Sequence, residues 1–407
     1  MSRSLSILLL CPWLPWPPHD GARIRILETL RFLSQRHRVV LVAPAYSPEQ
    51  HGGVAQLSSS GATVHAVTVS DGTLARLRRL SLGIVSGAPP IQAFHRNRAV
   101  AECVSRLTSE SNFDIVQIEF SFLAHYLHAV HGRSRPKTVL SMHNVESLRF
   151  ERELQFSAWN ARRLVVLADC YLFPRWEQRV VQSFDGVVAV SEPEATWIRR
   201  HAPRAAVTTV PNGVDAEFFR PQSAATIQHA VVFTGAMDYP PNIDAVLWFA
   251  DAILPVLRQS WPQLHFVVVG RRPPREILAL ASRPGIRITG EVDDIRPYLA
   301  EALAMVVPLR SGGGTRLKIL QAMAMARPVI STTLGAEGLA VANGQHLLIA
   351  DNPQQFADSL AMLVHSPEFA TRIAQAGRHL ALAEYDWKQC LRGLEDLYQT
   401  VLSGSQP

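Results

Sequence analysis

Residues 308–318 (PLRSGGGTRLK) combine three glycines with cations, the clearest chemical signal in the chain. Glycine lets a backbone approach a ligand closely, and the first turn of a helix offers unpaired N–H groups and a positive dipole end. Positions i, i+4 and i+7 of a helix share a face, so Lys318 and Gln321 would lie together. The predicted diphosphate site comprises Gly312, Gly313, Gly314, Thr315, Arg316, Lys318 and Gln321. The alternative is a plain glycine-rich turn with surface cations.

A second glycine, Gly235, ends another apolar run and is followed by a short polar loop (GAMDYPPN). We expect the Gly235 backbone to contact a ligand. We also expect Asp238 or Asn242 to cap a helix that begins at Ile243. Helix capping alone is an equally good explanation of this loop.

Two segments of the first half carry candidates for the other side of a site. Gly21 follows the first apolar run, with Arg23 close behind it. His143 follows a later run, with Asn144 and Glu146 beside it (SMHNVE). A histidine at a strand end with polar neighbours suits catalysis or ligand binding. The alternatives are a structural histidine and a strand-to-helix turn with a surface arginine.

Alternating strands and helices must position these segments, because short apolar runs alternate with helical patterns along the chain. The predicted strands of the first half are 6–10, 39–43, 64–69, 115–118, 138–141 and 186–190, with a helix at 22–35. Those of the second half are 230–234, 264–269, 286–289, 304–308 and 329–331, with helices at 243–257, 315–325 and 385–402. This pattern predicts two parallel α/β halves joined between about 195 and 228, with ligands at the carboxyl ends of the strands.

The composition fits two globular domains, since the chain has 407 residues, of which 47% are hydrophobic and 18% charged. The first 200 residues carry 23 Lys and Arg against 16 Asp and Glu, whereas the rest carry 17 against 18. The basic half favours a phosphate or anionic-lipid partner, or is an ordinary solvated surface. Nucleic acid is not expected, because only three residues are Lys. Four scattered cysteines and the lack of a long apolar stretch favour a reducing, cytoplasmic setting.

Several motifs are absent from the sequence. It has no D-x-D, H-E-x-x-H, G-x-S-x-G or G-x-G-x-x-G, and no C-x-x-C. We therefore expect no metal site of the carboxylate or thiolate kind. Nicotinamide enzymes, flavin enzymes, serine hydrolases and zinc peptidases become less favoured.

In combination, segments 235–242, 268–271, 290–295 and 312–329, with the joint segments 190–191 and 211–215, resemble the retaining glycosyltransferases of family 4. The resemblance implies the GT-B fold, in which two Rossmann-like parallel-sheet domains face a central cleft. Residues 1–200 would form an acceptor-binding domain and residues 201–383 a nucleotide-sugar-binding domain. A final helix, 384–403, would pack back on the first domain.

The resemblance also implies a reaction. A sugar would move from a nucleoside diphosphate sugar to a glycan or polyprenyl-linked acceptor, with retention and without a metal or other cofactor. Such a transfer belongs to cell-surface polysaccharide biosynthesis, in the cytoplasm or at the inner face of its membrane. An anionic membrane surface would meet arginines and tryptophans of the first half: Trp13, Trp16, Arg76, Arg78, Arg79, Arg96 and Arg98.

The resemblance assigns roles to individual residues. His143 would lie near the transferred sugar, and Gly21, Arg23, Asn144 and Glu146 would lie on the acceptor side. Arg271, Val292 and Asp294 would lie near the base and ribose, with Gly235 and Asp238 also on the donor side. Arg316 and Lys318 would stabilise the leaving diphosphate together with the helix dipole.

The sequence departs from the family at two places. Gly313 and Gln321 stand where the family has a pair of glutamates, and Ala236 and Asn242 stand near its usual arginine and lysine. Arg316 and Lys318 would supply the missing positive charge. Two other functions remain open: an inactive nucleotide-sugar-binding partner protein, and a sugar-nucleotide epimerase of the same architecture.

Overall fold

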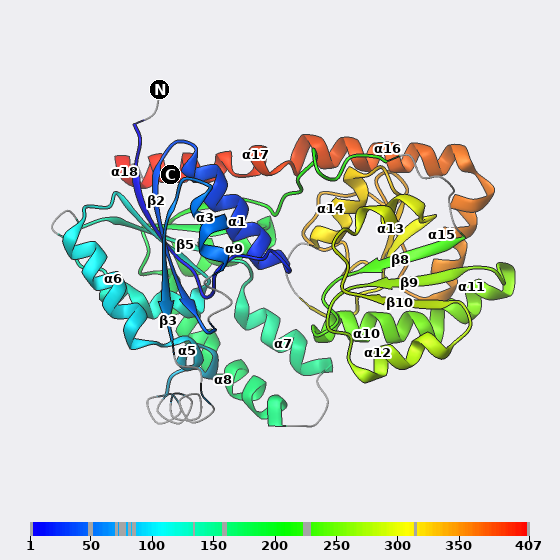
Figure 1. Cartoon of the computed structure of the whole chain (residues 1–407), viewed down its shortest axis with the longest axis horizontal. Coiled ribbons are helices and arrows are strands. Elements are labelled where there is room, and N and C mark those ends of the chain that lie inside the picture. The colour runs from blue at the N-terminus through cyan, green and yellow to red at the C-terminus, as the bar shows by residue number, and fades with distance from the viewer. Residues whose placement is uncertain are drawn as a thin grey trace. The chain divides into compact units, whose positions relative to one another are not determined.

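The computed structural model describes residues 3–47, 52–69, 72, 79, 83, 87–132, 135–156, 161–222, 229–312 and 316–404. The chain divides into two compact units. Unit 1 comprises Met1–Pro211 and Leu391–Pro407, and unit 2 comprises Asn212–Cys390. Each unit is built on a parallel sheet with helices packed against it, so the predicted fold class is confirmed (Figure 1).

The sheet of unit 1 has the strand order β3-β2-β1-β4-β5-β6-β7. Its strands are β1 (Ser6–Leu10), β2 (Arg38–Ala45), β3 (Thr63–Thr68), β4 (Ile115–Glu119), β5 (Lys137–Ser141), β6 (Gly186–Ala189) and β7 (Ala206–Thr209). A parallel sheet is covered on both faces, and the central strands are accordingly buried along nearly their whole length.

Helices of unit 1 connect these strands. They are α1 (Gly21–Ser34), α3 (Gly53–Ser58), α5 (Pro90–His95), α6 (Arg98–Glu110), η1 (Ser121–Ala129), α7 (Glu146–Phe156), α8 (Ala161–Val181), α9 (Glu192–His201) and α18 (Arg392–Ser403). Helix α18 packs on β6 and β7. A Cβ atom at Gly186 would lie 3.0 Å from Val401 Cγ1, so glycine permits this close approach.

The sheet of unit 2 has the order β10-β9-β8-β11-β12-β13. Its strands are β8 (Ala230–Thr234), β9 (His265–Val269), β10 (Ile286–Gly290), β11 (Ala304–Val307), β12 (Val329–Ser331) and β13 (Leu348–Ile349). The helices include a π-helical turn, η2, between α10 and α11. They are α10 (Pro240–Trp248), η2 (Phe249–Ile253), α11 (Leu254–Ser260), α12 (Arg275–Ala279), η3 (Leu280–Ser282), α13 (Arg296–Glu301), α14 (Leu317–Ala324), α15 (Pro353–His365), α16 (Pro367–Glu384) and α17 (Trp387–Cys390).

The strand order reverses once in each sheet, between β1 and β4 in unit 1 and between β8 and β11 in unit 2. Ligands of open α/β sheets bind outside the carboxyl ends of the strands at such a switch point. The loops after β1 and β4 and those after β8 and β11 are therefore the places to look for a site. The segments of Gly21, His143, Gly235 and 308–318 each follow one of these strands or an adjacent one, whereas segment 290–295 follows β10 at the edge of the second sheet.

The unit boundaries differ from the predicted ones at 200 and 384. Strand β7 extends the first sheet by pairing with β6, so unit 1 continues to Pro211. At the other end, Val214 forms a bridge with Asp386, and a Cβ atom at Gly213 would lie 2.8 Å from the Trp387 ring. These contacts keep α17 in unit 2. The predicted helix 385–402 is thus two helices, which separate at Leu391.

Candidate active site

Lys318 of α14 reaches the loop after β8. Its ammonium group donates a hydrogen bond to Asn242 Oδ1 (3.0 Å), and Asn242 Nδ2 donates to the carbonyl of Ala236 (2.8 Å). The ammonium nitrogen also lies 3.8 Å from the centre of the Phe233 ring. Burial lowers the pKa of Lys318 well below its usual range, and the charge of Arg316 lowers it further. The fold thus places Lys318 where burial and the neighbouring Arg316 disfavour the charged form of its amino group.

Gly235 makes room for this cation. Its φ is +152°, and a Cβ atom there would lie 3.0 Å from Lys318 Nζ and 2.8 Å from Asn242 Nδ2. A Cβ at Gly270 would lie only 1.7 Å from the Gly235 carbonyl oxygen. The carboxyl ends of β8 and β9 therefore pack too closely for side chains. The ammonium group of Lys318 thus lies beside Gly235 and Asn242.

Arg316 is the N-cap residue of α14, and Gly312 lies close to its guanidinium group. Gly312 has φ +105°, a left-handed conformation that favours glycine, and a Cβ there would lie 3.2 Å from Arg316 Nη2. Arg316 is buried, with 8% of its surface exposed. Gly313, Gly314 and Thr315, which belong to the predicted diphosphate site, lie outside the described residues.

Arg310 is directed elsewhere. Its guanidinium group pairs with Asp244 of α10 (2.5 and 3.1 Å) and lies over the Trp248 ring. Of the three cations in segment 308–318, Arg316 and Lys318 therefore remain together at the start of α14. Both lie at the switch point of the second sheet.

The capping prediction for the loop after β8 is wrong. Helix α10 begins at Pro240, three residues before Ile243, and its N-cap residue Tyr239 makes no side-chain cap hydrogen bond. Pro240 and Pro241 have no N–H group to satisfy and hold φ near its helical value. Asn242 is thus already helical and binds Lys318, while Asp238 accepts a hydrogen bond from Arg272 (3.3 Å).

The residues predicted near the base and ribose lie on other loops of unit 2. Met237 N donates to the Arg271 carbonyl (2.9 Å), so the loops after β8 and β9 are joined. Arg271 and Val292 are half-buried, as is Gln321 on α14. Asp294 binds the backbone and guanidinium of Arg296, and these hydrogen bonds lower its pKa. The structure therefore brings Gly235, Gly312, Arg316 and Lys318 together, whereas Asp294 is committed to Arg296.

His143 of unit 1 pairs with a residue that sequence reasoning missed. Its Nε2 lies 2.7 Å from Glu119 Oε2, and both side chains are buried. The Phe120 ring stacks on the imidazole, with ring centres 3.9 Å apart and an angle of 18°. Gln117 Nε2 donates to the other oxygen of Glu119 (2.6 Å). The signal that the sequence offers is the alternation of two polar residues, Gln117 and Glu119, in an otherwise apolar strand (IVQIE).

The charge state of this pair follows from its surroundings. Burial lowers the pKa of His143, and the hydrogen bond and charge of Glu119 only partly offset this effect. Burial also acts to raise the pKa of Glu119, but hydrogen bonds from His143 and Gln117 and the charge of Arg25 lower it overall. Glu119 is therefore a carboxylate, and it accepts a hydrogen bond from His143 Nε2–H. Among the described residues, Nδ1 of His143 has no hydrogen-bond partner.

Phe120 has a strained backbone. Its φ is +72°, which for a bulky non-glycine residue costs about 1–3 kcal/mol. Its N–H donates to the Ser141 carbonyl (2.8 Å), and its ring contacts Phe122 and Trp13. Such strain persists only where the surroundings enforce it, and here it places an aromatic ring on His143.

The predicted acceptor-side residues fall into two groups. Gly21 begins α1, and Arg23 pairs with Asp20 and lies 5.2 Å from the Trp13 ring. Trp13 contacts Phe120, so a row of aromatic side chains connects Arg23 to His143. The second group is internal to one loop and helix: Asn144 Nδ2 donates to Glu146 Oε1 (3.3 Å), and Glu146 Oε2 accepts from Arg149 (2.6 Å).

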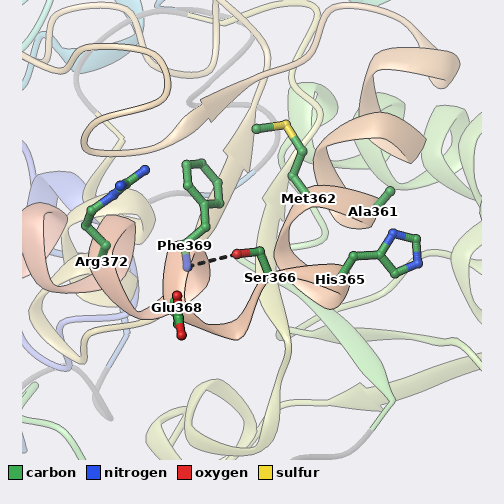
Figure 2. Close-up of a pocket in the computed structure, with 7 residues that line it drawn as sticks. All are labelled: Ala361, Met362, His365, Ser366, Glu368, Phe369 and Arg372. Carbon is green, nitrogen blue, oxygen red and sulfur yellow. Dashed lines mark hydrogen bonds between the residues drawn. The ribbon is translucent and has the colours of Figure 1, made fainter.

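A surface pocket of about 620 Å³ lies apart from both sets of residues, at the corner between α15 and α16 (Figure 2). It is lined by Ala361, Met362, His365, Ser366, Glu368, Phe369 and Arg372. The Ser366 hydroxyl accepts a hydrogen bond from Phe369 N (3.3 Å) and so caps α16. None of the predicted site residues contributes to this pocket.

Two family models match the chain. Residues 19–218 match "Glycosyltransferase Family 4" and residues 228–366 match "Glycosyl transferases group 1". An uncharacterized glycosyltransferase of Methanocaldococcus jannaschii is 26% identical over 111 residues, which are 27% of this chain and 31% of that one. The D-inositol 3-phosphate glycosyltransferase of Rhodococcus jostii is 29% identical over 55% of this chain and 54% of its own. The chain thus spans about a third and about half of these two relatives.

Other similar proteins extend over nearly the whole chain. An uncharacterized 44.6 kDa protein in the cps region of Klebsiella pneumoniae is 20% identical over 84% of this chain and 87% of its own. The structure of Anabaena Alr3699/HepE with UDP and glucose has a TM-score of 0.66 at 15% identity, covering 97% and 100% of the two chains. Sucrose-phosphate synthase of Thermosynechococcus elongatus has a TM-score of 0.71 at 16% identity, covering 99% and 100%. These structures confirm the GT-B fold.

Proposed function

The chain is a glycosyltransferase of the GT-B fold, with a family 4 domain followed by a group 1 domain, and we propose that its donor is a nucleoside diphosphate sugar. The acceptor is a glycan or a polyprenyl-linked sugar, and the anomeric configuration is retained. The observation that carries this proposal is the cation of Lys318, held beside Gly235 at the switch point of the second sheet. The similar structures with bound UDP support a nucleotide donor.

The donor site needs no metal ion in this proposal. Lys318 and Arg316 neutralise the charge that develops on the leaving diphosphate, in concert with the N-terminal end of α14. Gly235 and Gly312 let the backbone approach the phosphates. Gly313, Gly314 and Thr315, which lie outside the described residues, belong to the proposed diphosphate site. Asp238, Arg271, Val292, Asp294 and Gln321 surround the base and sugar portions.

Unit 1 supplies the acceptor side. His143 contacts the transferred sugar, and Gly21, Arg23, Asn144 and Glu146 orient the acceptor. Retention follows from attack on the same face that the diphosphate leaves, with the leaving diphosphate taking the acceptor proton. The relative in the cps region of Klebsiella pneumoniae supports a role in cell-surface polysaccharide biosynthesis.

Calorimetric titration with UDP, GDP, ADP and their sugar conjugates, with EDTA present, tests this proposal. We expect one nucleotide to bind and the others to bind much more weakly. Loss of that binding in the double variant Arg316→Ala with Lys318→Ala would support the diphosphate site. If none of the nucleotides binds, the donor-site assignment is wrong.

Gln321 distinguishes an active enzyme from an inactive binding partner. A carboxamide oxygen can accept a hydrogen bond from a ribose hydroxyl as a carboxylate does, so we expect Gln321→Glu to change the turnover rate by no more than about threefold. Gln321→Ala, which removes the acceptor, should weaken donor binding by about tenfold. Turnover is measured as release of the free nucleoside diphosphate with and without acceptor.

Two other results would favour the alternatives. Turnover that occurs only in Gln321→Glu would indicate that the natural protein is an inactive nucleotide-sugar-binding partner. Conversion of the donor sugar to its epimer without any acceptor would indicate an epimerase.

We also propose that unit 1 touches an anionic membrane through the outer face of α7 and α8, which pack against each other (Figure 1). Apolar side chains of this face are exposed: Leu148 39%, Leu164 64%, Val165 42%, Leu167 38% and Tyr171 70%. Arg175 and Arg179 are exposed on α8, whereas its acids Asp169 and Glu177 are buried. On α8, exposed apolar and basic side chains without exposed acids suit an anionic bilayer surface, while α7 carries the exposed acid Glu151.

This surface differs from the one predicted from the sequence. Trp13 and Trp16 are half-buried, Trp13 against Phe120 and Trp16 against Gly53. Arg76 and Arg78 lie outside the described residues. Within the described residues, none of the helices combines the length and apolar character that a membrane span requires.

Leu164→Glu should reduce sedimentation with vesicles that contain phosphatidylglycerol by about tenfold, because it places a negative charge in the apolar face. Leu278→Glu is the matched control, since Leu278 is 51% exposed on unit 2 and should not affect binding. Equal binding of Leu164→Glu and the unmodified protein, or no binding by either, would exclude this face as a membrane contact.

A further inference from the structure

Three hydrogen bonds connect His143 to the last helix of the chain. Tyr398 of α18 donates from its hydroxyl to Gln117 Oε1 (2.5 Å), and Gln117 Nε2 donates to Glu119 Oε1 (2.6 Å). Glu119 Oε2 accepts from His143 Nε2 (2.7 Å). The four side chains are buried, with exposed fractions between 0% and 7%. All of them belong to unit 1.

The chemistry of these four groups decides which atom donates and which accepts in each of the three hydrogen bonds. A carboxylate only accepts hydrogen bonds, so Gln117 must turn its NH₂ group toward Glu119. The amide oxygen of Gln117 then faces Tyr398, which must donate. Burial raises the pKa of Tyr398 well above its usual range, so the hydroxyl keeps its proton. On the other side, His143 must carry its proton on Nε2, and Nδ1 is left as an acceptor.

A structural role alone does not account for these groups. Burying a carboxylate and an amide in a central strand costs free energy that hydrogen bonds only offset. Well-packed apolar side chains of similar size often stabilise a fold as well or better. These hydrogen-bonded polar groups instead fix one tautomer and one orientation of the His143 imidazole ring.

We propose that Glu119, oriented by Gln117 and Tyr398, is a positioning residue that fixes His143 as the Nε2–H tautomer with Nδ1 ready to accept a hydrogen bond. That Nδ1 accepts from a hydroxyl of the transferred sugar rests on the proposed function. The tautomer itself does not. The last helix, α18, thus helps to orient His143 through Tyr398.

Nitrogen-15 NMR of the histidine-labelled protein tests the tautomer without any substrate. We expect His143, assigned by the loss of its signals in His143→Asn, to carry its proton on Nε2. In Glu119→Gln, Gln117 still donates to the new amide oxygen, so the new NH₂ group faces the imidazole. Nε2 must then accept, and the proton should move to Nδ1. A proton on Nδ1 in the unmodified protein, or no change in Glu119→Gln, would overturn the proposal.

Tyr398→Phe removes only the hydrogen bond between Tyr398 and Gln117, which is the one farthest from His143. The Gln117 amide loses its anchor, and we expect the His143 nitrogen signals to shift and broaden. Tyr126→Phe is the matched control, because Tyr126 is another buried tyrosine of unit 1 whose hydroxyl binds the His95 carbonyl instead. It should leave the His143 signals in place. Equal shifts in both variants would mean that Tyr398 acts only through general stability.

Kinetics separate this proposal from the proposed function. In Glu119→Gln we expect kcat to fall by about a hundredfold with a much smaller change in the KM for the donor, because in the proposed function unit 2 binds the nucleoside diphosphate part of the donor. A protein with the expected tautomers but no transfer activity would contradict the proposed function alone. A protein with full activity in Glu119→Gln would contradict the positioning role alone.

Discussion

Replacing Lys318 by methionine is expected to weaken binding of the nucleoside diphosphate by about a hundredfold. The ammonium group is the cation held closest to Gly235, and a charge-assisted hydrogen bond to phosphate would be lost with it. Methionine has nearly the same length and fills the space beside the Phe233 ring. The variant should therefore fold as well as the unmodified protein, and calorimetry of the two measures the difference in affinity.

The same site predicts how binding depends on pH. Because burial, and then the charge of Arg316, lower the pKa of Lys318, its cationic fraction in the empty protein falls as pH rises through that lowered value. The unfolded chain holds this proton more tightly, so the group lowers stability below its usual pKa. Diphosphate binding should weaken as pH rises and should take up a proton. Titrations in two buffers of different ionisation enthalpy measure the uptake.

Lys388→Met is the matched control, because Lys388 is an exposed lysine of unit 2 that pairs with Glu217. It should leave both affinity and pH dependence unchanged. If Lys318→Met binds the nucleotide as tightly as the unmodified protein does, Lys318 does not contact the phosphates.

Removing the Glu177 side chain, in Glu177→Ala, is expected to lower the free energy of unfolding of unit 1 by about 4 kcal/mol. Glu177 is fully buried in α8 and accepts hydrogen bonds from Ser121 Oγ (2.7 Å), Glu146 N (3.0 Å) and Ser147 N (3.0 Å). The two backbone groups are the first N–H groups of α7, which no residue of that helix can satisfy. Two buried N–H groups without an acceptor cost about 1–3 kcal/mol each.

Urea unfolding followed by circular dichroism measures this loss as a shift of the midpoint. Glu102→Ala serves for comparison, since Glu102 is an exposed carboxylate of unit 1 paired with Arg98 four residues away. Exposed pairs contribute about 0.5 kcal/mol or less. A similar small shift in both variants would show that α7 does not depend on Glu177 for its first turn.

Much of the sheet could be predicted from the sequence. The observed bounds of β1, β8 and β12 are the predicted ones, because each is a short apolar run with a small polar residue at one end. The single predicted helix 243–257 instead begins at Pro240 and contains the π-helical turn η2. Side-chain periodicity cannot reveal a local change of backbone hydrogen bonding. It also does not show that Pro240 and Pro241 begin the helix three residues before Ile243.

The site was predictable only in part. The glycines and cations of the second half identify the loop after β11 because glycine and positive charge are each specific signals. Nothing in the sequence shows that Lys318 would reach Asn242, since that contact joins residues 76 positions apart. Glu119 was missed for a similar reason, because a glutamate in a buried strand has meaning only once His143 and Tyr398 are placed beside it.

The division of the chain also has a consequence for biosynthesis. Unit 1 is made of two separate stretches, and α18 cannot pack on β6 and β7 until all of unit 2 has been synthesised. A nascent chain that has emerged from the ribosome only as far as residue 390 would thus expose the surface around Gly186 of β6, which Leu397 and Val401 cover in the complete protein. Domains usually fold in order as they emerge. Here the domain that is synthesised first is completed last. The hydrogen bonds that connect His143 to Tyr398 through Glu119 and Gln117 can form only after α18 has been synthesised.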